Sequence, residues 1–484
     1  MQTNKSSGIS RFFDCKTKMQ RLGITNSGFN TILIKSVLIL GLGLTMLFFG
    51  ALSAQAQTIY YVRAGATGTG NGSDWNNAYT SLPSTLVRGA TYYIADGSYS
   101  PYTFDDAVSG SSVITIKKAT ASNHGTETGW SSAYGDGVAT FSANSGTVFT
   151  IGAPYLIIDG AYEYGFKIDI SGYDGPVTNG IWWSAGFSNI TIKNVEIVGP
   201  GGASNYNYRF QCNGIKSTKG ASSNINIRNC KIHGVDAGIY FLFVTGSTIE
   251  YCDIYDIRSN QWVPEDPANR NSSYCAWNVA RGYCDLHDDV LYLGAFNNLT
   301  VRYNKFHNWR TEGVFISGLA GTSNGLYVYG NIWYNSSKTT GQKALQVRDP
   351  SSIQNYLTGF YFYNNSIGRT TSSVVLASTS MTLPVVVRNN LLYDTGSISV
   401  ISGGTYSHNT TATSDPFISL STGNLRLAGP TVAGYTLPSP YNKDILGVTR
   451  GVDGIWDHGA LDFSNSNPPP AGLNAPNRVR IMSP

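Results

Sequence analysis

Short runs of alternating apolar and polar residues recur through the middle of the chain, and each is followed by an Asn or Cys and a second short run. One copy is Asn189-Ile-Thr-Ile-Lys-Asn-Val-Glu-Ile-Val, and another is Asn224-Ile-Asn-Ile-Arg-Asn-Cys-Lys-Ile-His. Further copies begin at Ser247, Asn298, Leu326, Phe360, Val385 and Thr405. Alternation with a period of two predicts short β-strands. Unequal spacing between copies predicts stacked units with loops of unequal length, and hence an all-β solenoid.

The regions that flank the repeats predict a covered end and two terminal segments. We expect a strand at residues 58–63, a Gly-rich loop at 64–74 and a short amphipathic helix at 76–87. Strand and helix together would form an N-terminal cap, because an uncovered solenoid end leaves an open sheet edge. The solenoid domain is predicted to span residues 57–463, and residues 464–484 form a Pro-rich tail that is typical of a linker.

The first 56 residues have the pattern of a secretory signal peptide. Lys35 precedes an apolar run from Val37 to about Gly50, and Ala54-Gln55-Ala56 is a small-x-small cleavage site. A start at Met19 would give a signal of more ordinary length. An uncleaved anchor is the alternative, since the run is near the lower length limit for a bilayer span. We expect cleavage, no stable membrane span, and a secreted or cell-surface protein, with the periplasm as another destination.

Cleavage would change the charge of the protein. Lys plus Arg would fall from 33 to 27 and Asp plus Glu from 29 to 28, so the formal net charge of +4 would become −1. No basic stripe or aromatic-interleaved basic run is present, which argues against a nucleic-acid partner.

Asn and Cys at matching turns predict ladders within the solenoid. Stacked amide side chains hydrogen-bond from coil to coil and tolerate left-handed backbone. The predicted ladder contains Asn194, Asn229, Asn304, Asn331, Asn365 and Asn390. Cys230 and Cys252 occupy the same place in consecutive repeats, so we expect a free, buried stacked pair. Cys275 and Cys284 bracket a short loop and would form a disulfide in an oxidising compartment or stay reduced.

On these repeats, the chain resembles the right-handed parallel β-helix proteins of the pectate-lyase-like superfamily. The opening from Tyr60 to Trp75 and the closing Gly451-Val-Asp-Gly-Ile-Trp-Asp-His-Gly-Ala-Leu-Asp-Phe resemble secreted bacterial members. The resemblance covers most of residues 58–463. It implies a right-handed parallel β-helix with an N-terminal cap, in which the closing motif covers the last coil. A shared fold does not by itself fix the chemistry.

The densest group of reactive side chains follows the longer of two insertions, which lie at residues 199–212 and 258–284. Long loops in a compact solenoid are usually functional. Matching positions of adjacent coils lie about 4.8 Å apart, so residues from three successive coils, with two His among them, are expected on one face. These residues are Asp285, His287, Asp288, Asp289, His307, Arg310, Glu312, Lys343 and Arg348, beside Trp262 and Trp277 in the insertion.

This inventory suits work on an acidic polysaccharide. Removal of the C5 proton of a uronate needs a base, a cation on the carboxylate and an acid for the leaving oxygen or the opposite face. His287 or Lys343 would be the base, and Arg310 or Arg348 the carboxylate clamp. Trp262 and Trp277 would stack on sugar rings.

The same group offers ligands for a cation. Asp288, Asp289 and Glu312 would instead hold Ca²⁺, which takes several oxygen ligands.

Locally, Asp285-Leu-His287-Asp288 is similar to the Asp-Pro-His-Asp/Glu motif of mannuronan C5-epimerases, which have this fold. That resemblance implies catalytic roles for Asp285, His287 and Glu312, with Leu286 in place of the motif's Pro. A polysaccharide lyase begins with the same proton abstraction, so lyase and epimerase stay open.

Other functions remain as alternatives. A glycoside hydrolase would use Asp288 and Asp289 as its carboxylate pair. A non-catalytic, extracellular glycan-binding solenoid would present exposed Trp and Tyr in a row without convergent catalytic side chains, and a structural solenoid would present neither feature. His307 follows the same pattern as His233 in an earlier repeat (Lys-Ile-His and Lys-Phe-His), which favours a turn residue over a catalyst.

We expect the protein to be a monomer.

Overall fold

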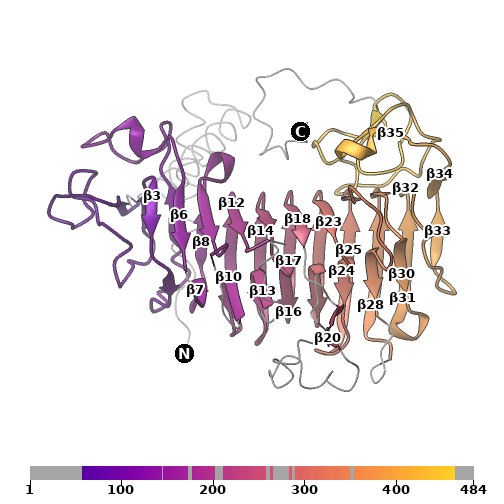
Figure 1. Cartoon of the computed structure of the whole chain (residues 1–484), viewed down its shortest axis with the longest axis horizontal. Helices are drawn as coiled ribbons and strands as arrows, with labels where there is room; N and C mark the ends of the chain where they lie inside the picture. Colours follow the sequence, from indigo (N-terminus) through magenta and orange to yellow (C-terminus); the bar gives the residue numbers. More distant parts are fainter. Residues whose placement is uncertain are drawn as a thin grey trace, which may run out of the picture. The chain divides into compact units, whose positions relative to one another are not determined.

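The computed structural model describes residues 57–143, 145–172, 177–201, 211–257, 262–264, 283–285, 289–348 and 354–463. Three long parallel sheets wind along one axis as a right-handed β-helix, which confirms the predicted fold (Figure 1). In each full coil the chain passes through sheets C, A and B in that order. The predicted signal peptide and Pro-rich tail lie outside the described residues, and both remain predictions. Within the described ranges, no helix is long and apolar enough to cross a bilayer.

Sheet A contains β1 (Ile59–Val62), β2 (Thr91–Ile94), β5 (Ile114–Lys118), β8 (Leu156–Asp159), β11 (Ser188–Lys193), β14 (Ser222–Arg228), β17 (Val244–Glu250), β22 (Asn297–Arg302), β25 (Ser323–Tyr329), β28 (Leu357–Tyr363), β31 (Met381–Arg388) and β33 (Thr405–Ser407). Sheet B contains β3 (Gly97–Tyr99), β6 (Ala139–Ser142), β9 (Phe166–Asp169), β12 (Val195–Val198), β15 (Lys231–His233), β18 (Asp253–Ile257), β23 (Lys305–Trp309), β26 (Ile332–Tyr334), β29 (Ser366–Gly368), β32 (Leu391–Tyr393) and β34 (Thr410–Ala412). Sheet C contains β4 (Tyr102–Phe104), β7 (Thr147–Ile151), β10 (Val177–Trp183), β13 (Gln211–Ser217), β16 (Ala237–Leu242), β21 (Asp289–Gly294), β24 (Glu312–Ile316), β27 (Lys343–Val347) and β30 (Ser372–Leu376). Two antiparallel pairs join β19 (Trp262–Pro264) to β20 (Tyr283–Asp285) and β35 (Phe417–Ser419) to β36 (Asn424–Leu427). Short 3-10 turns are η1 (Ser132–Tyr134), η2 (Tyr162–Tyr164), η5 (Ser378–Ser380) and η6 (Leu420–Thr422).

The core consists of aliphatic side chains stacked from coil to coil. Ile192, Ile227, Ile249, Val301 and Val328 pair in register across five strands of sheet A and are fully buried. Their neighbours along each strand point outward, because successive side chains of a strand alternate between its two faces. The alternation in the sequence therefore determines which side chains of each strand face the core.

The predicted Asn ladder is two adjacent ladders. Asn194 directly follows β11 and Asn229 directly follows β14, with left-handed φ values of 58° and 48°. Asn229 Nδ2 donates to Asn194 Oδ1 at 2.7 Å. One position later in the coil, Asn304, Asn331, Asn365 and Asn390 form a second ladder, which Asn409 extends. Cys230, in the same coil as Asn229, and Cys252, in the next coil, occupy the position that Asn304 takes one coil later. Asn304 Oδ1 accepts from the Cys252 N–H at 2.9 Å, so the second ladder continues from the Cys pair.

Cys230 and Cys252 are free and buried, as predicted. Burial, together with the neighbouring Cys230, raises the pKa of the Cys252 thiol. The pair therefore acts as small packing residues. Cys275 lies outside the described residues and Cys284 is described only in its backbone, so their pairing remains open.

The predicted helix at residues 76–87 is wrong. Tyr79 instead pairs with β1 as an extended bridge, exchanging backbone hydrogen bonds with Tyr61 and Arg63. Pro83 lacks an N–H and disfavours helical backbone in the residue before it, Leu82. The segment still buries Ala78, Leu82 and Leu86, and it covers the outer edge of β1 by pairing rather than by a helix.

The closing motif, residues 451–463, was expected to cap the last coil. It reaches Thr410 in the last coil, where His458 Nδ1 lies 2.7 Å from Thr410 Oγ1. It also bonds to two earlier coils, since Gly459 N–H donates to Asn389 O and Trp456 Nε1 donates to Asn364 Oδ1. The motif therefore packs along the corner between sheets A and B.

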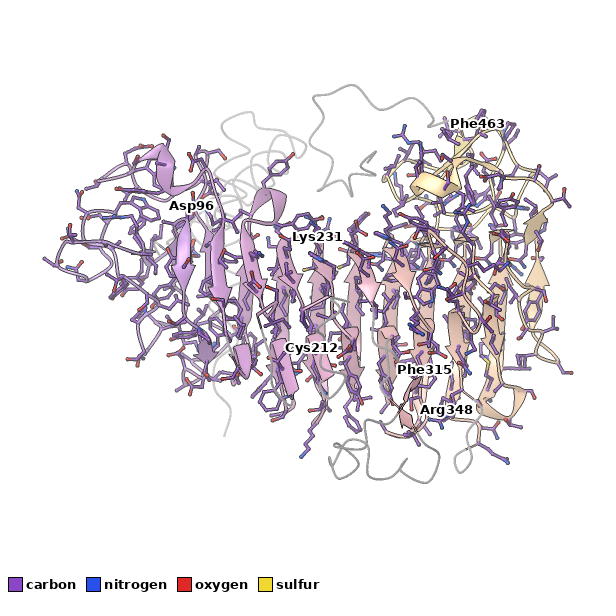
Figure 2. All side chains as sticks on the ribbon, viewed as in Figure 1. Asp96, Cys212, Lys231, Phe315, Arg348 and Phe463 are labelled. Carbon is purple, nitrogen blue, oxygen red and sulfur yellow. The ribbon has the colours of Figure 1, made fainter. Side chains whose placement is uncertain are left out.

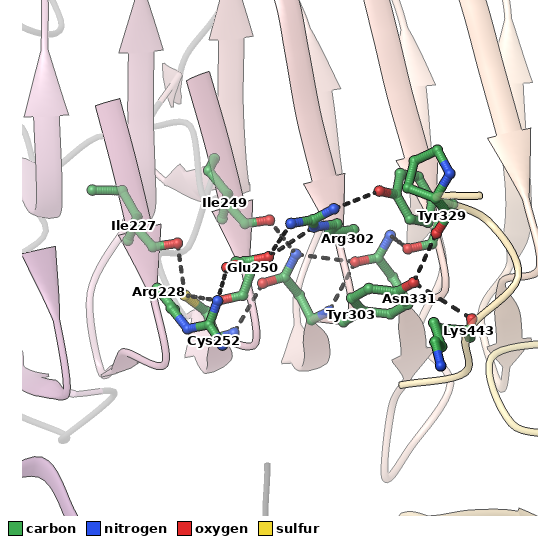
Figure 3. A network of polar contacts seen from close by, with 12 residues as sticks. Ile227, Arg228, Ile249, Glu250, Cys252, Arg302, Tyr303, Tyr329, Asn331 and Lys443 are labelled. Carbon is green, nitrogen blue, oxygen red and sulfur yellow. Dashed lines mark hydrogen bonds and ion pairs between the residues drawn. The ribbon is translucent and has the colours of Figure 1, made fainter. Parts of the chain in front are cut away.

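On the outer face of sheet A, a ladder of ion pairs links three coils (Figure 3). Glu250 accepts from Arg228 on one side and from Arg302 at 2.7 Å on the other, and Arg302 donates to the Tyr329 hydroxyl at 2.9 Å. The Glu250 side chain is 9% exposed and each Arg side chain 30%. One carboxylate thus compensates two cations on neighbouring strands.

We expect Glu250→Gln to lower the free energy of unfolding by about 2 kcal/mol, less than the ~3–5 kcal/mol of a fully buried pair, because the Arg side chains keep part of their hydration. Urea denaturation would measure the change. The matched control is Asp394→Asn, since the Lys338–Asp394 pair is about 40% exposed on both sides. That change should cost less than about 1 kcal/mol. Equal effects of the two variants would contradict the assigned role of Glu250.

Candidate active site

Both insertions precede strands of sheet C, and the outer face of this sheet carries the candidate site. Residues 199–212 connect β12 of sheet B to β13 of sheet C, and residues 258–284 lie between β18 and β21. Two strands of sheet C, β13 and β21, therefore each follow one of the insertions.

A repeated local pattern sets which side chains of sheet C point outward. A small residue and then an aliphatic residue face the core, as with Gly214-Ile215 and Gly238-Ile239. A Cβ at either glycine would lie 2.5 Å from a carbonyl oxygen of the next strand. The residues before and after each such pair point away from the core and form two rows, here called the first row and the second row.

The first row contains two carboxylates and one ammonium group on adjacent strands. Asp289, Glu312 and Lys343 are register partners on β21, β24 and β27. Lys343 Nζ donates to Glu312 Oε1 at 2.9 Å, while Glu312 Oε2 has no hydrogen-bond partner in the part of the chain that the structure describes. Asp289 is fully buried and Glu312 is 6% exposed. A buried acid pair thus lies beside an ammonium group with a 26% exposed side chain.

The second row runs parallel to the first and is largely aromatic. It contains Trp182, Lys216, Tyr240, Tyr292, Phe315 and Gln346, all in register on successive strands. The Tyr240 and Tyr292 rings stack at 4.3 Å and the Tyr292 and Phe315 rings follow at 5.4 Å. Lys216 Nζ lies 4.8 Å from the centre of the Tyr240 ring. Burial lowers the pKa of Lys216 to about 8 and raises that of Tyr240.

The structure brings together Glu312, Lys343 and Asp289 from the predicted set, but separates the two predicted clamps. Arg310 is exposed at the turn before β24, whereas Arg348 is exposed after the end of β27. Arg348 follows Lys343 by five residues, or about 16 Å along an extended strand. Arg310 therefore lies where the strands of sheet C begin, and Arg348 lies where they end. Figure 2 labels Arg348, together with Phe315 of β24.

His307 is not on this face, so the expectation of two His on one face is wrong. It belongs to β23 of sheet B, where its ring stacks between Tyr255 at 4.6 Å and Tyr334 at 5.1 Å. Its Nε2 lies 3.0 Å from Asp253 Oδ1. It is a strand residue rather than the expected turn residue, and the structure excludes it from the site.

Several predicted residues cannot be placed as side chains. His287, Asp288 and Trp277 lie outside the described residues. Asp285 and Trp262 are described only as backbone, and they pair with each other across β20 and β19. Their assigned roles remain predictions.

The described residues do not by themselves form a calcium site. No group of three or more His, Cys, Asp or Glu side chains among them is placed to hold a metal ion. Asp289 and Glu312 supply carboxylates, but Glu312 Oε1 already accepts from Lys343. A site completed by Asp288 remains a prediction.

The second row was not predicted from the sequence, although a signal for it is present there. The phrases Gly180-Ile-Trp-Trp, Gly214-Ile-Lys-Ser, Gly238-Ile-Tyr-Phe, Val290-Leu-Tyr-Leu, Gly313-Val-Phe-Ile and Ala344-Leu-Gln-Val share a small–aliphatic–variable–inward pattern. The third position of each phrase is the outward residue. Aligning these phrases would have shown a lysine within a row of aromatic residues.

Comparison with known proteins bears on the fold. No family model matches the chain, and no curated protein matches its sequence. The structure of pectate lyase Pel9A matches with a TM-score of 0.53 and 14% identity, covering 84% of this chain and 96% of that one. A rhamnogalacturonan lyase matches at 0.42 and 13% identity, with 75% and 91% covered. A PL6 family polysaccharide lyase from Pseudopedobacter saltans matches at 0.31 and 12% identity, with 74% and 94% covered. The chain therefore has the parallel β-helix fold seen in pectate lyase Pel9A.

Proposed function

We propose that the protein acts on an acidic polysaccharide at the outer face of sheet C, by removing the C5 proton of a uronate unit. The observation that carries the proposal is the registered row of Asp289, Glu312 and Lys343. It sets an ammonium group held by a buried carboxylate beside a row of aromatic rings. The fold shared with pectate lyase Pel9A supports the substrate class by analogy only.

In this proposal Lys343 stabilises the charge that develops during the reaction. Loss of the C5 proton delocalises an electron pair into the sugar carboxylate, and a fixed ammonium close to those oxygens lowers the barrier. Glu312 keeps Lys343 in position through the 2.9 Å hydrogen bond. His287 is the proposed base, and Asp285 orients it.

The proton abstraction can lead to two products. If the C4–O bond breaks and the leaving oxygen takes a proton, a C4–C5 double bond forms and the chain is cleaved. If a proton returns to the opposite face of C5, the sugar is epimerised and the chain stays intact. Asp289, beside Glu312, is the proposed acid for either outcome.

Reaction with polyuronates tests the proposal directly. We expect the purified protein to process at least one member of a panel of polygalacturonate, polymannuronate and polyguluronate, with and without Ca²⁺. Absorbance of unsaturated ends would identify a lyase, and proton NMR of an uncleaved polymer would identify an epimerase. His287→Ala should abolish either signal, because a missing general base typically costs 100-fold or more.

His233→Ala is the matched control, since His233 lies on sheet B and bonds to Glu196 at 3.1 Å. It should retain activity. Equal loss in both variants would point to damage of the fold, and no turnover of any polyuronate would overturn the enzymatic proposal.

The aromatic second row also favours a second candidate, a glycan-binding solenoid without turnover. Trp182 and Tyr240 are half-buried and offer contact area to a sugar chain, whereas Tyr292 and Phe315 are 7% and 4% exposed and support the row from within. Binding of a polyuronate without any change to the polymer would support this candidate over the enzyme.

Export is part of the proposal. The signal pattern of residues 1–56 is the support for a secreted or cell-surface location, where extracellular polysaccharide would be met.

A further inference from the structure

The second row contains one cation that the proposed reaction does not use. Lys216 on β13 is the register partner of Trp182 on β10 and of Tyr240 on β16. All three side chains are half-buried and point away from the core. Their neighbours in the first row are Asn179, Asn213 and Ala237, none of which is charged, and Asn213 Nδ2 donates to Asn179 Oδ1 at 2.9 Å.

We propose that Lys216, between Trp182 and Tyr240, binds the carboxylate of a second anionic sugar unit, away from the unit that reacts. The proposal rests on the proposed function, and it adds a subsite to that face. The Tyr240 ring would support the sugar, and the Lys216 ammonium would pair with its carboxylate.

The spacing suits a polymer rather than a single sugar. Lys216 and Lys343 belong to strands four coils apart, in the order β13, β16, β21, β24 and β27. At about 4.8 Å for each coil, this is about 19 Å along the axis. A polyuronate lying along the axis would therefore place the carboxylates of two different units near these two cations.

Protonation of Lys216 makes the subsite sensitive to pH. Burial alone lowers the pKa of Lys216 to about 8. Among the described register partners of Lys216, the titratable group is Tyr240, whose pKa is raised and which stays neutral in this range. A bound carboxylate favours the charged amine and raises its pKa. Affinity should therefore be constant below pH 7 and fall as pH rises through about 8, because the free amine loses its proton first.

Calorimetric titration with oligogalacturonate and oligomannuronate, between pH 6 and pH 9.5, would test the subsite. Carboxyl-reduced versions of both oligosaccharides serve as neutral controls. Lys216→Met should weaken binding of the charged ligand by about 10- to 100-fold at pH 6.5, as expected for loss of a hydrogen bond to a charged group. Lys216→Arg should restore binding and remove the fall above pH 8, because Arg stays charged.

The outcomes separate this proposal from the proposed activity. A Lys216→Met variant with unchanged melting temperature, wild-type affinity and the wild-type pH profile would overturn the subsite alone. Binding that depends on Lys216 without any turnover would support the subsite while the proposed reaction fails. No binding of either charged oligosaccharide by the wild-type protein would overturn the subsite, whereas the turnover panel alone decides the proposed reaction.

Discussion

Replacement of Lys343 by Met is expected to lower the turnover of a polyuronate by about 100- to 1,000-fold, with little change in KM. The magnitude is that of removing one donor from a site that stabilises developing negative charge. The loss falls on kcat because the ammonium interacts more strongly with the charge-rich transition state than with the ground-state carboxylate. Steady-state rates on whichever polyuronate the wild-type protein processes would measure it.

Two variants make this expectation specific. Lys343→Arg keeps a cation that can bond to Glu312, and it should retain more activity than Lys343→Met. Lys167→Met removes a comparable partly exposed Lys that pairs with Asp169 on sheet B at 2.8 Å, so it should leave turnover unchanged.

Lys343→Met also leaves Glu312 as a buried carboxylate without its cation, which can destabilise the fold. Thermal melts therefore accompany the rates. A Lys343→Met variant that melts as the wild type and keeps turnover within threefold would remove Lys343 from the mechanism.

Replacement of Asn331 by Ala is expected to lower the free energy of unfolding by about 3 kcal/mol, because several buried polar groups lose their partner at once. Asn331 is fully buried. The Oδ1 of Asn331 accepts two hydrogen bonds from Asn304, one from the backbone N–H at 2.9 Å and one from the side-chain Nδ2 at 3.0 Å. Its own Nδ2 donates to Val301 O at 2.9 Å. Urea denaturation followed by circular dichroism would measure the change.

The matched control is Asn324→Ala. Asn324 also bonds to an Asn of the adjacent coil, Asn297, at 3.2 Å, but that pair is exposed. Its removal should change stability by less than about 0.5 kcal/mol. Similar costs for both variants would show that the burial of the second ladder does not increase its contribution to stability.

The fold could be predicted because its determinants are local and repeated. Alternation such as Ile190, Ile192 and Ile227 sets which face of a strand is buried, and an Asn at the strand end permits the left-handed turn that starts the next strand. The helix expected at residues 76–87 failed for the opposite reason. Tyr79 finds its partner in β1, a contact that the local pattern of residues 76–87 does not contain.

The candidate site was predicted only in part, because it depends on which residues share a register. Glu312 and Lys343 were correctly expected to meet, since both follow turns in consecutive coils. His307 was misplaced because its position relative to the corners of the coil decides whether it lies on sheet B or sheet C. Lys216 was missed because its row becomes visible only when the strands of sheet C are aligned.

By itself, the sequence determined an all-β solenoid with stacked Asn and Cys at its turns, because hydrophobic alternation and turn residues act over a few neighbouring positions. Only the tertiary structure decided that Asp289, Glu312 and Lys343 form one row, that Arg310 and Arg348 lie at opposite edges, and that Lys216 lies between two aromatic side chains. These relations join residues of different coils. Loops of unequal length separate such residues along the chain, so only the hydrogen-bonded register between strands brings them together.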